Sequence, residues 1–330
     1  MKITRRSLLL VVIISYLIIG CEKPVTLISS NHHQFTENAV IDADISDDGK
    51  YSLILEVNNS VSLWDNTTYS LINEWEGSEF TQQQYKVVLS KDNQWIAVSG
   101  KHFVTLFSVN GTHKKLSWKV NGFSKDAQIS QVMLNSIGNK VIIGLTEGSV
   151  IVADITSETR SQFNLHEGPV TQLKFSDNEQ RLISASLDGQ VNKWDISTGK
   201  VIWNDKLPFR ITSLAFDDLS QKLFISDALN NQRFLSLDRG VDISKLNYFE
   251  RNRYFREAIF LDGTNKLLTS SSKYQISLWN VETGDEHSQG EIRAHNFGST
   301  VLDFAVNENN DILTLSSDGV LELWSKTLFR

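Results

Sequence analysis

Cysteine is almost absent from the 330-residue chain, which has a single such residue, Cys21. A lone cysteine excludes an intramolecular disulfide and any zinc site built from several thiolates. An excess of positive charge is also lacking, because 32 Lys and Arg face 39 Asp and Glu, for a formal net charge of −7 at pH 7. Proteins that grip nucleic acid usually carry a basic face, so we expect no nucleic-acid partner.

Motifs of catalysis and metal binding are lacking as well. The seven histidines are scattered, and none has a His-Glu-x-x-His spacing. The chain has no Gly-x-Ser-x-Gly elbow, no phosphate-binding loop and no dinucleotide fingerprint. We therefore predict no metal, no cofactor and no enzymatic activity. One alternative stays open, since two carboxylates on different strands could meet and hydrolyse a glycosidic bond.

An apolar run occupies the N-terminus, from Leu8 to Ile19, behind a basic start. It is shorter than the ~20 residues that span a membrane and has the length of a signal-peptide core. The stretch Leu17-Ile18-Ile19-Gly20-Cys21 resembles a bacterial lipobox. The resemblance implies that residues 1–20 are a lipoprotein signal peptide and that Cys21 receives the acyl chains that anchor the protein to a membrane.

The residues on either side of this segment indicate the export route and the membrane, inner or outer, that would hold the protein. Glu22 follows the cysteine, and since Asp there typically marks inner-membrane retention, the resemblance favours the outer membrane, with the protein facing the periplasm. Thr4-Arg5-Arg6 also resembles a twin-arginine signal, so export by that route stays open beside general secretion. Removal of Lys2, Arg5 and Arg6 would lower the net charge from −7 to −10.

Polar turns recur along the rest of the chain at a steady period. Their first residues are separated by 44, 45, 41, 41, 45 and 45 positions, and they are Ser46, Ser90, Asn135, Ser176, Asp217, Asp262 and Asn307. Short apolar or alternating runs precede and follow each turn, a pattern typical of strands. Four strands in each period of 41–45 residues are the spacing of a β-propeller blade, so the sequence predicts an all-β propeller with seven blades.

The fourth repeat carries a motif that resembles the WD40 family. It reads His-Glu-Gly-Pro-Val from 166, Ser-Ala-Ser-Leu-Asp-Gly from 184 and Val-Asn-Lys-Trp-Asp from 191. The resemblance implies a buried hydrogen-bonded set, and the matching positions are His166, Ser184 or Ser186, Asp188 and Trp194. A poorer second set consists of His295, Ser316, Asp318 and Trp324. PQQ-type propellers are the alternative family, because Thr198-Gly199-Lys200 and Trp203 resemble their repeat.

Closure of the ring is predicted from the chain ends. Only six residues follow Trp324, too few for an outer strand of the seventh blade. The strand-like segment Val25–Ser30 has no blade of its own, so we expect it to supply the missing strand. The predicted organisation is thus a signal peptide at 1–20, a tether and ring-closing strand at 21–35 and a propeller at 36–330. We expect a monomer.

One stretch departs from the blade rhythm, and the repeat frame places it on the same rim as His166. Aromatic residues and Arg are enriched in protein-interface hot spots, so the stretch is a candidate binding surface. Packing between blades is the alternative interpretation. The residues concerned are Tyr248, Phe249, Arg251, Arg253, Tyr254, Phe255 and Arg256.

The function predicted from these features is the binding or scaffolding of other proteins of the cell envelope. WD40 propellers usually present their rims to partners, although a fold alone does not fix function. Two alternatives stay open. One is a propeller enzyme, either a hydrolase or lyase or a quinone-dependent dehydrogenase. The other is an envelope-assembly helper similar to the lipid-anchored propeller of the outer-membrane β-barrel assembly machinery.

Overall fold

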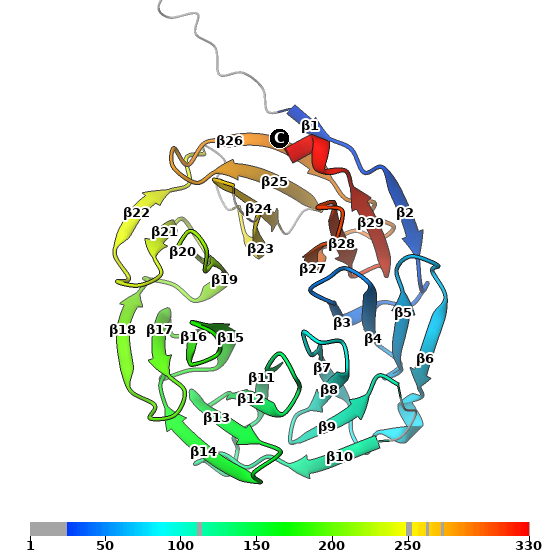
Figure 1. Cartoon of the computed structure of the whole chain (residues 1–330), viewed down its shortest axis with the longest axis vertical. Coiled ribbons are helices and arrows are strands. Elements are labelled where there is room, and N and C mark those ends of the chain that lie inside the picture. Colours follow the sequence, from blue (N-terminus) through cyan, green and yellow to red (C-terminus); the bar gives the residue numbers. More distant parts are fainter. Residues whose placement is uncertain (1–24, 111–113, 249–252, 262–263, 272–273, 330) are drawn as a thin grey trace, which may run out of the picture.

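Seven β-sheets are arranged around a central channel in the computed structural model of the chain (Figure 1). The structure describes residues 25–110, 114–248, 253–261, 264–271 and 274–329. The prediction of a seven-bladed propeller closed by an N-terminal strand is confirmed. Within the described ranges no helix is long and apolar enough to cross a membrane. The two helical segments there are short 3-10 turns, η1 (Gly77–Glu79) and η2 (Lys326–Phe329).

Each blade is an antiparallel sheet whose first strand lines the channel and whose last strand faces outward (Figure 1). Blade one is β3 (Val40–Ile45), β4 (Tyr51–Glu56), β5 (Val61–Asp65) and β6 (Leu71–Trp75). Blade two is β7 (Gln84–Leu89), β8 (Trp95–Gly100), β9 (Phe103–Ser108) and β10 (Lys114–Lys119). Blade three is β11 (Ile129–Leu134), β12 (Lys140–Leu145), β13 (Ser149–Asp154) and β14 (Thr159–Asn164).

The remaining blades repeat this order. Blade four is β15 (Val170–Ser176), β16 (Arg181–Ser186), β17 (Gln190–Asp195) and β18 (Val201–Lys206). Blade five is β19 (Ile211–Asp217), β20 (Lys222–Asp227), β21 (Gln232–Ser236) and β22 (Asp242–Lys245). Blade six is β23 (Phe255–Leu261), β24 (Lys266–Ser271), β25 (Gln275–Asn280) and β26 (Glu286–Glu291). Blade seven contributes β27 (Val301–Val306), β28 (Ile312–Ser316) and β29 (Val320–Trp324).

Two N-terminal strands finish the ring, and they correct one prediction. β2 (Asn31–Gln34) pairs antiparallel with β29 and is the outer strand that blade seven lacks. β1 (Val25–Leu27) instead adds a fifth, parallel strand to β26 of blade six. The prediction that Val25–Ser30 closes blade seven is therefore wrong by one strand. Outer strands of a propeller are mostly exposed, so the closing segment needs no apolar pattern, and Asn-His-His-Gln has none.

Burial follows the position of the strand in its blade. The second strand is covered on both faces in every blade and is correspondingly apolar, as in β12, where Val141–Leu145 are all buried. The buried apolar residues group into seven clusters, each spanning two neighbouring blades. One of them joins blade seven to blade one, through residues such as Leu315 and Ile54. Core packing therefore continues around the whole ring, and the blades hold one another in place.

Each inner strand has a bulge after its first residue, for example between Val40 and Asp42 in β3. A bulge bends the strand and raises its local twist. Beyond the bulge, alternate residues turn toward the channel and the residues between them enter the core. In β3, Asp42 and Asp44 face the channel and Ala43 between them is buried. The sequence of the inner strands thus determines the chemistry of the channel.

Candidate protein-interaction surface

Two rims flank the channel, and the course of each blade defines them. The interblade rim, as named here, holds the loops that join one blade to the next and the hairpins between second and third strands. The opposite rim holds the other two hairpins of each blade. His166 lies in an interblade loop and Asp188 in a hairpin of that same rim, both in blade four.

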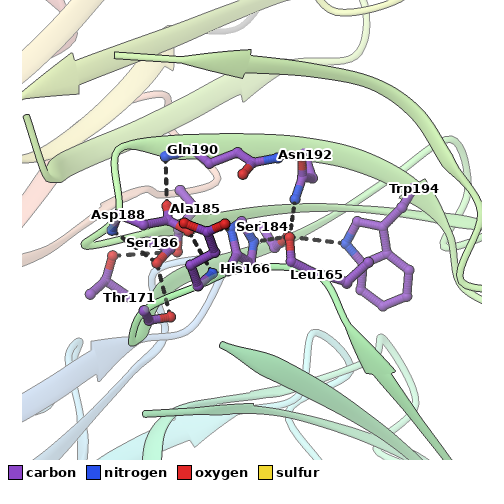
Figure 2. A network of polar contacts seen from close by, with 12 residues as sticks. Leu165, His166, Thr171, Ser184, Ala185, Ser186, Asp188, Gln190, Asn192 and Trp194 are labelled. Carbon is purple, nitrogen blue, oxygen red and sulfur yellow. Dashed lines mark hydrogen bonds and ion pairs between the residues drawn. The ribbon is translucent and has the colours of Figure 1, made fainter. Parts of the chain in front are cut away.

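The blade-four residues His166, Ser184 and Trp194 meet in one buried network (Figure 2). The Ser184 hydroxyl lies 2.7 Å from Nε2 of His166 and accepts a hydrogen bond from Nε1 of Trp194 at 3.1 Å. Nδ1 of His166 lies 3.7 Å from Oδ2 of Asp188, beyond hydrogen-bond range. Ser184, rather than Ser186, is therefore the residue that links the imidazole to the indole.

Asp188 and Ser186 act on the backbone instead. Asp188 accepts hydrogen bonds from the N–H groups of Glu167 at 2.8 Å and Gln190 at 2.7 Å. The Ser186 hydroxyl donates to the carbonyl of Gly168 and accepts the N–H of Asp188. Two of these bonds, to Glu167 and Gly168, fasten the hairpin to the interblade loop, and the other two hold the hairpin itself, so this set shapes the rim beside it.

His166 is held as a neutral imidazole. Its side chain is buried, and burial lowers its pKa to about 4, although the nearby Asp188 carboxylate opposes the fall. Trp194 already donates to Ser184, so the serine hydroxyl can give its own proton to Nε2 of His166. The imidazole proton then sits on Nδ1, where it faces Asp188. A neutral ring at this depth suits a structural partner.

The Trp–hydroxyl pair recurs in blades six and seven at the same spacing. Trp279 donates to Thr269 at 2.8 Å and Trp324 to Thr314 at 3.1 Å, each across ten residues as in blade four. All three indoles are buried. Ile54 lies ten residues before Trp64 in blade one, and this indole is only half-buried and bonds Ser62 instead. A hydroxyl at that position therefore accompanies full burial of the indole.

The second predicted set differs from the first. The side chain of His295 is exposed, and only its backbone N–H reaches Asp318, at 2.7 Å. Ser316 accepts the N–H of Asp318 and does not contact Trp324, whose partner is Thr314. Blade seven thus keeps the Asp and Trp contacts but leaves the His side chain outside the position that the motif assigns to it.

The candidate binding stretch divides into buried and exposed parts, with Phe249 and Arg251 outside the described residues. Arg253 is buried and forms a two-pronged ion pair with Glu286 at 2.7 and 3.0 Å. Its guanidinium carbon lies 4.9 Å from the ring centroid of Trp279. The ring of Tyr248 also lies against this guanidinium, and Phe255 is fully buried. Tyr248, Arg253 and Phe255 therefore pack between blades five and six. Burial removes Arg253 and Phe255 from the candidate partner-binding surface, whereas Tyr248 is half-buried.

Two residues of the stretch stay at the surface, together with neighbours that the sequence reading missed. Tyr254 is half-buried with Arg210 above its ring at 5.9 Å, and Arg256 is exposed. We name this group, with its neighbours in the loops before blades five and seven, the arginine–aromatic arc. Its members are Phe209, Arg210, Tyr254, Arg256, Arg293 and Phe297.

Phe297 is the most exposed apolar residue of the described chain. Phe209 and Phe123 are also exposed and lie in the interblade loops before blades five and three. Each of these rings stands in a loop of the repeat, outside any strand, and that placement was a signal available in the sequence. Large exposed aromatic side chains on one rim are typical of an interaction surface.

The channel is lined by charged residues of both signs. Asp42 accepts the Val87 N–H at 2.9 Å and pairs with Lys86, also at 2.9 Å. Asp44 accepts the N–H of Leu89 at 2.6 Å. On the far side of blade one, Asp303 accepts the Ile45 N–H at 2.7 Å. Each of these carboxylates therefore ties one inner strand to the next.

Burial raises the pKa of Asp303 to about 6 and that of Glu257 to about 7, and Lys174 opposes both rises.

The expected absence of catalytic residues remains a prediction. Within the described ranges no three His, Cys, Asp or Glu side chains are grouped so that they could hold a metal ion. A cavity of about 440 Å³ opens at the opposite-rim mouth of the channel, beside Asp44, Lys174 and Phe216. Cys21, the predicted lipidation site, lies outside the described residues.

Comparison with known proteins supports the WD40 type. A family model described as the Vps8 beta-propeller matches residues 112–245, which extend from the outer strand of blade two to that of blade five. The chain is 25% identical over 165 residues to "WD repeat-containing protein SL1-17" of Schistosoma mansoni, covering 49% of this chain and 52% of that protein.

Two further relatives match shorter portions of their own length. The "Retinoblastoma-binding protein 5 homolog" of Drosophila melanogaster is 23% identical over 160 residues, or 45% of this chain and 30% of that protein. The "WD repeat and HMG-box DNA-binding protein 1" of Mus musculus is 38% identical over 77 residues, or 22% of this chain and 7% of that protein. The matches thus span about half or less of these curated relatives.

Proposed function

We propose that this chain, a WD40-type β-propeller, is a lipid-anchored protein-interaction module of the bacterial cell envelope that holds its partner on the interblade rim. The observation that carries the proposal is the arginine–aromatic arc. It combines exposed rings with guanidinium groups on one rim of a protein whose net charge is otherwise negative. The relatives support an interaction or scaffolding module, since several are named for WD repeats.

The charges of the arc indicate the chemistry of the partner. In the described part of the chain, Arg210 and Arg256 form no ion pair, while Arg293 lies 3.9 Å from Glu322. Unpaired guanidinium groups beside exposed rings suit a protein segment that carries carboxylates and apolar side chains. The partner would be an acidic envelope protein that places such a segment over blades five to seven.

The location follows from the sequence alone. In this proposal residues 1–20 are a signal peptide, Cys21 carries the acyl chains and the propeller faces the periplasm, from the outer membrane in preference to the inner. The test is fractionation of a Cys21→Ser variant, which should leave the membrane fraction or accumulate as precursor. Normal processing and membrane attachment of this variant would refute the lipid anchor.

The binding rim is tested by paired charge reversals in the lipidated protein. Arg210→Glu with Arg256→Glu should lower partner capture from detergent-solubilised membranes about tenfold, which equals roughly 1.4 kcal/mol of binding free energy. The matched control reverses Lys91 and Lys200, which are exposed on the opposite rim, and should leave capture unchanged. Both variants should keep the melting temperature and circular dichroism of the parent. Equal capture by the two variants would place the partner elsewhere.

A further inference from the structure

The described chain enters the fold at the outer edge of the ring and not at either rim (Figure 1). β1 is the outermost strand of blade six and sits at the edge of the ring (Figure 1). Val25 and Ile28 are 60% and 71% exposed there. An anchored chain therefore approaches the propeller from its edge and meets neither rim directly.

The distance from the anchor to this edge is limited by covalent geometry. Four residue steps separate Cys21 from Val25. An extended chain spans at most about 3.6 Å per residue, so the two Cα atoms lie within roughly 14 Å of each other. If Cys21 carries acyl chains at the bilayer surface, β1 cannot be further from that surface than this limit permits.

The direction of β1 shows which end of the strand lies nearer the interblade rim. β1 runs parallel to β26, with Val25 beside Ser288 and Leu27 beside Gly290. β26 continues into the loop of Phe297 on the interblade rim, so β1 also points toward that rim. Val25, the anchored end of β1, therefore lies farther from the interblade rim than Leu27 does. Ile28 follows toward that rim and lines one pocket with Arg293 of the arc.

We infer that the propeller stands edge-on at the membrane, with β1 and the exposed side chains of Val25 and Ile28 against the lipid surface, and that this posture leaves the interblade rim open to the periplasm except at Arg293, which lines one pocket with Ile28. The inference rests on the proposed lipid anchor. Exposed apolar side chains alone would not select this edge, because the outer strands of blades two and four also expose Leu116, Val201 and Ile202. The short tether distinguishes the edge at Val25 and Ile28, because it keeps this edge close to the anchor.

A fluorescent label distinguishes the edge from the rest of the ring. In the lipidated protein, Ile28→Cys is labelled with an environment-sensitive fluorophore and reconstituted into phosphatidylethanolamine and phosphatidylglycerol vesicles that contain a doxyl-lipid quencher. The matched control is Leu116→Cys on β10, on the far side of the ring (Figure 1). A second control is Phe297→Cys on the interblade rim. We expect several-fold stronger quenching at 28 than at 116 or 297.

Two results would overturn the inference while the anchor stands. One is equal quenching at the three positions in protein that floats with the vesicles, and the other is the strongest quenching at 297. Failure of the wild-type protein to float with vesicles would refute the anchor itself, and with it the posture.

A longer tether supplies an independent check. Ten Gly and Ser residues inserted between Pro24 and Val25 raise the maximum reach from the anchor to roughly 50 Å. The variant should still float, but quenching at 28 should fall toward the level at 116. Unchanged quenching at 28 would show that the contact does not depend on the tether and would overturn its role in setting the posture.

Discussion

Blades four and six bury a tryptophan at the same place but surround it with different polar chemistry. In blade four a neutral imidazole, His166, shares the Ser184 hydroxyl with Trp194. In blade six a permanently charged guanidinium, Arg253, lies over Trp279 and needs Glu286 as its counter-ion. The difference shows that the group beside the buried indole can be neutral or charged, provided that a charge is balanced.

The loss of stability on removal of one polar partner should differ between the two blades. A neutral group can be satisfied by one hydroxyl, whereas a buried cation that loses its carboxylate remains an uncompensated charge. Blade six should therefore be the more sensitive of the two to a single substitution. The variants below test that ranking, in order of expected effect.

Removal of one partner of the blade-six ion pair should have the largest effect. Arg253→Met leaves Glu286 without the guanidinium that holds both its oxygens, so the free energy of unfolding should fall by about 3–5 kcal/mol. The measurement is urea denaturation followed by tryptophan fluorescence. Adding Glu286→Gln should recover at least half of the loss, because no unpaired charge then remains. A single variant as stable as the parent would show that the pair contributes nothing.

The shared hydroxyl of blade four should have an intermediate effect. Ser184→Ala leaves the indole of Trp194 and the imidazole of His166 without their partner, so we expect a loss of about 1–3 kcal/mol in the same assay. Ser184→Thr is the matched control and should cost less than half as much, since Thr269 and Thr314 hold that position in blades six and seven. Equal losses for the two variants would assign the effect to packing and not to the hydroxyl.

The last effect is a loss of stability at low pH that comes from His166 in blade four. The pKa of His166 is about 4 in the folded protein, and an unfolded histidine titrates near its ordinary 6.5. Below pH 6.5 the unfolded chain therefore binds a proton that the folded chain does not, and stability is lost as the pH falls toward 4. His166→Gln abolishes this loss. The stability advantage of the parent over the variant should shrink by on the order of 2 kcal/mol between pH 7.5 and 4.5.

Glu257 and Asp303 act in the opposite sense, because their raised pKa values make stability fall as the pH rises. Both are present in parent and variant, so their contributions cancel in the difference. His295→Gln, which removes an exposed ring, serves as the control for a histidine substitution at the surface. A flat difference for His166→Gln would show that the imidazole is not held neutral.

The regular part of the fold could be predicted from the sequence because every blade repeats the same turn at the same distance. Trp194 of blade four and a serine partner, either Ser184 or Ser186, could also be predicted, since they lie in a motif of nearly fixed spacing. The choice of Ser184 came from the structure. The ring-closing strand was not, because Asn31–Gln34 is an outer strand whose side chains are mostly exposed and which leaves no apolar pattern. The apolar Val25–Leu27 was the more strand-like segment and was assigned in its place.

The candidate site was harder to predict for a different reason. The run from Tyr248 to Arg256 contains rings and arginines in alternation, and composition alone cannot say which of them turns inward. The partner that draws Arg253 inward is Glu286, 33 residues later and on the outer strand of the same blade. The arc that remains exposed joins Phe209, Arg256 and Phe297, residues from three blades. Its existence depends on the packing of blades five, six and seven against one another.

The pairing of β2 with β29 also has a consequence for the order of events during synthesis. The first complete strand to be made after β1 has as its partner one of the last, since Asn31 pairs with Leu323. At a translation rate of 5–20 residues per second, roughly 15–60 s separate their appearance. Throughout that interval β2 has no partner strand, and blade one lacks its neighbour on the side of blade seven. A chain cut short before Val320 would leave β2 permanently unpaired, so it would present the open strand edge that β29 covers in the full ring.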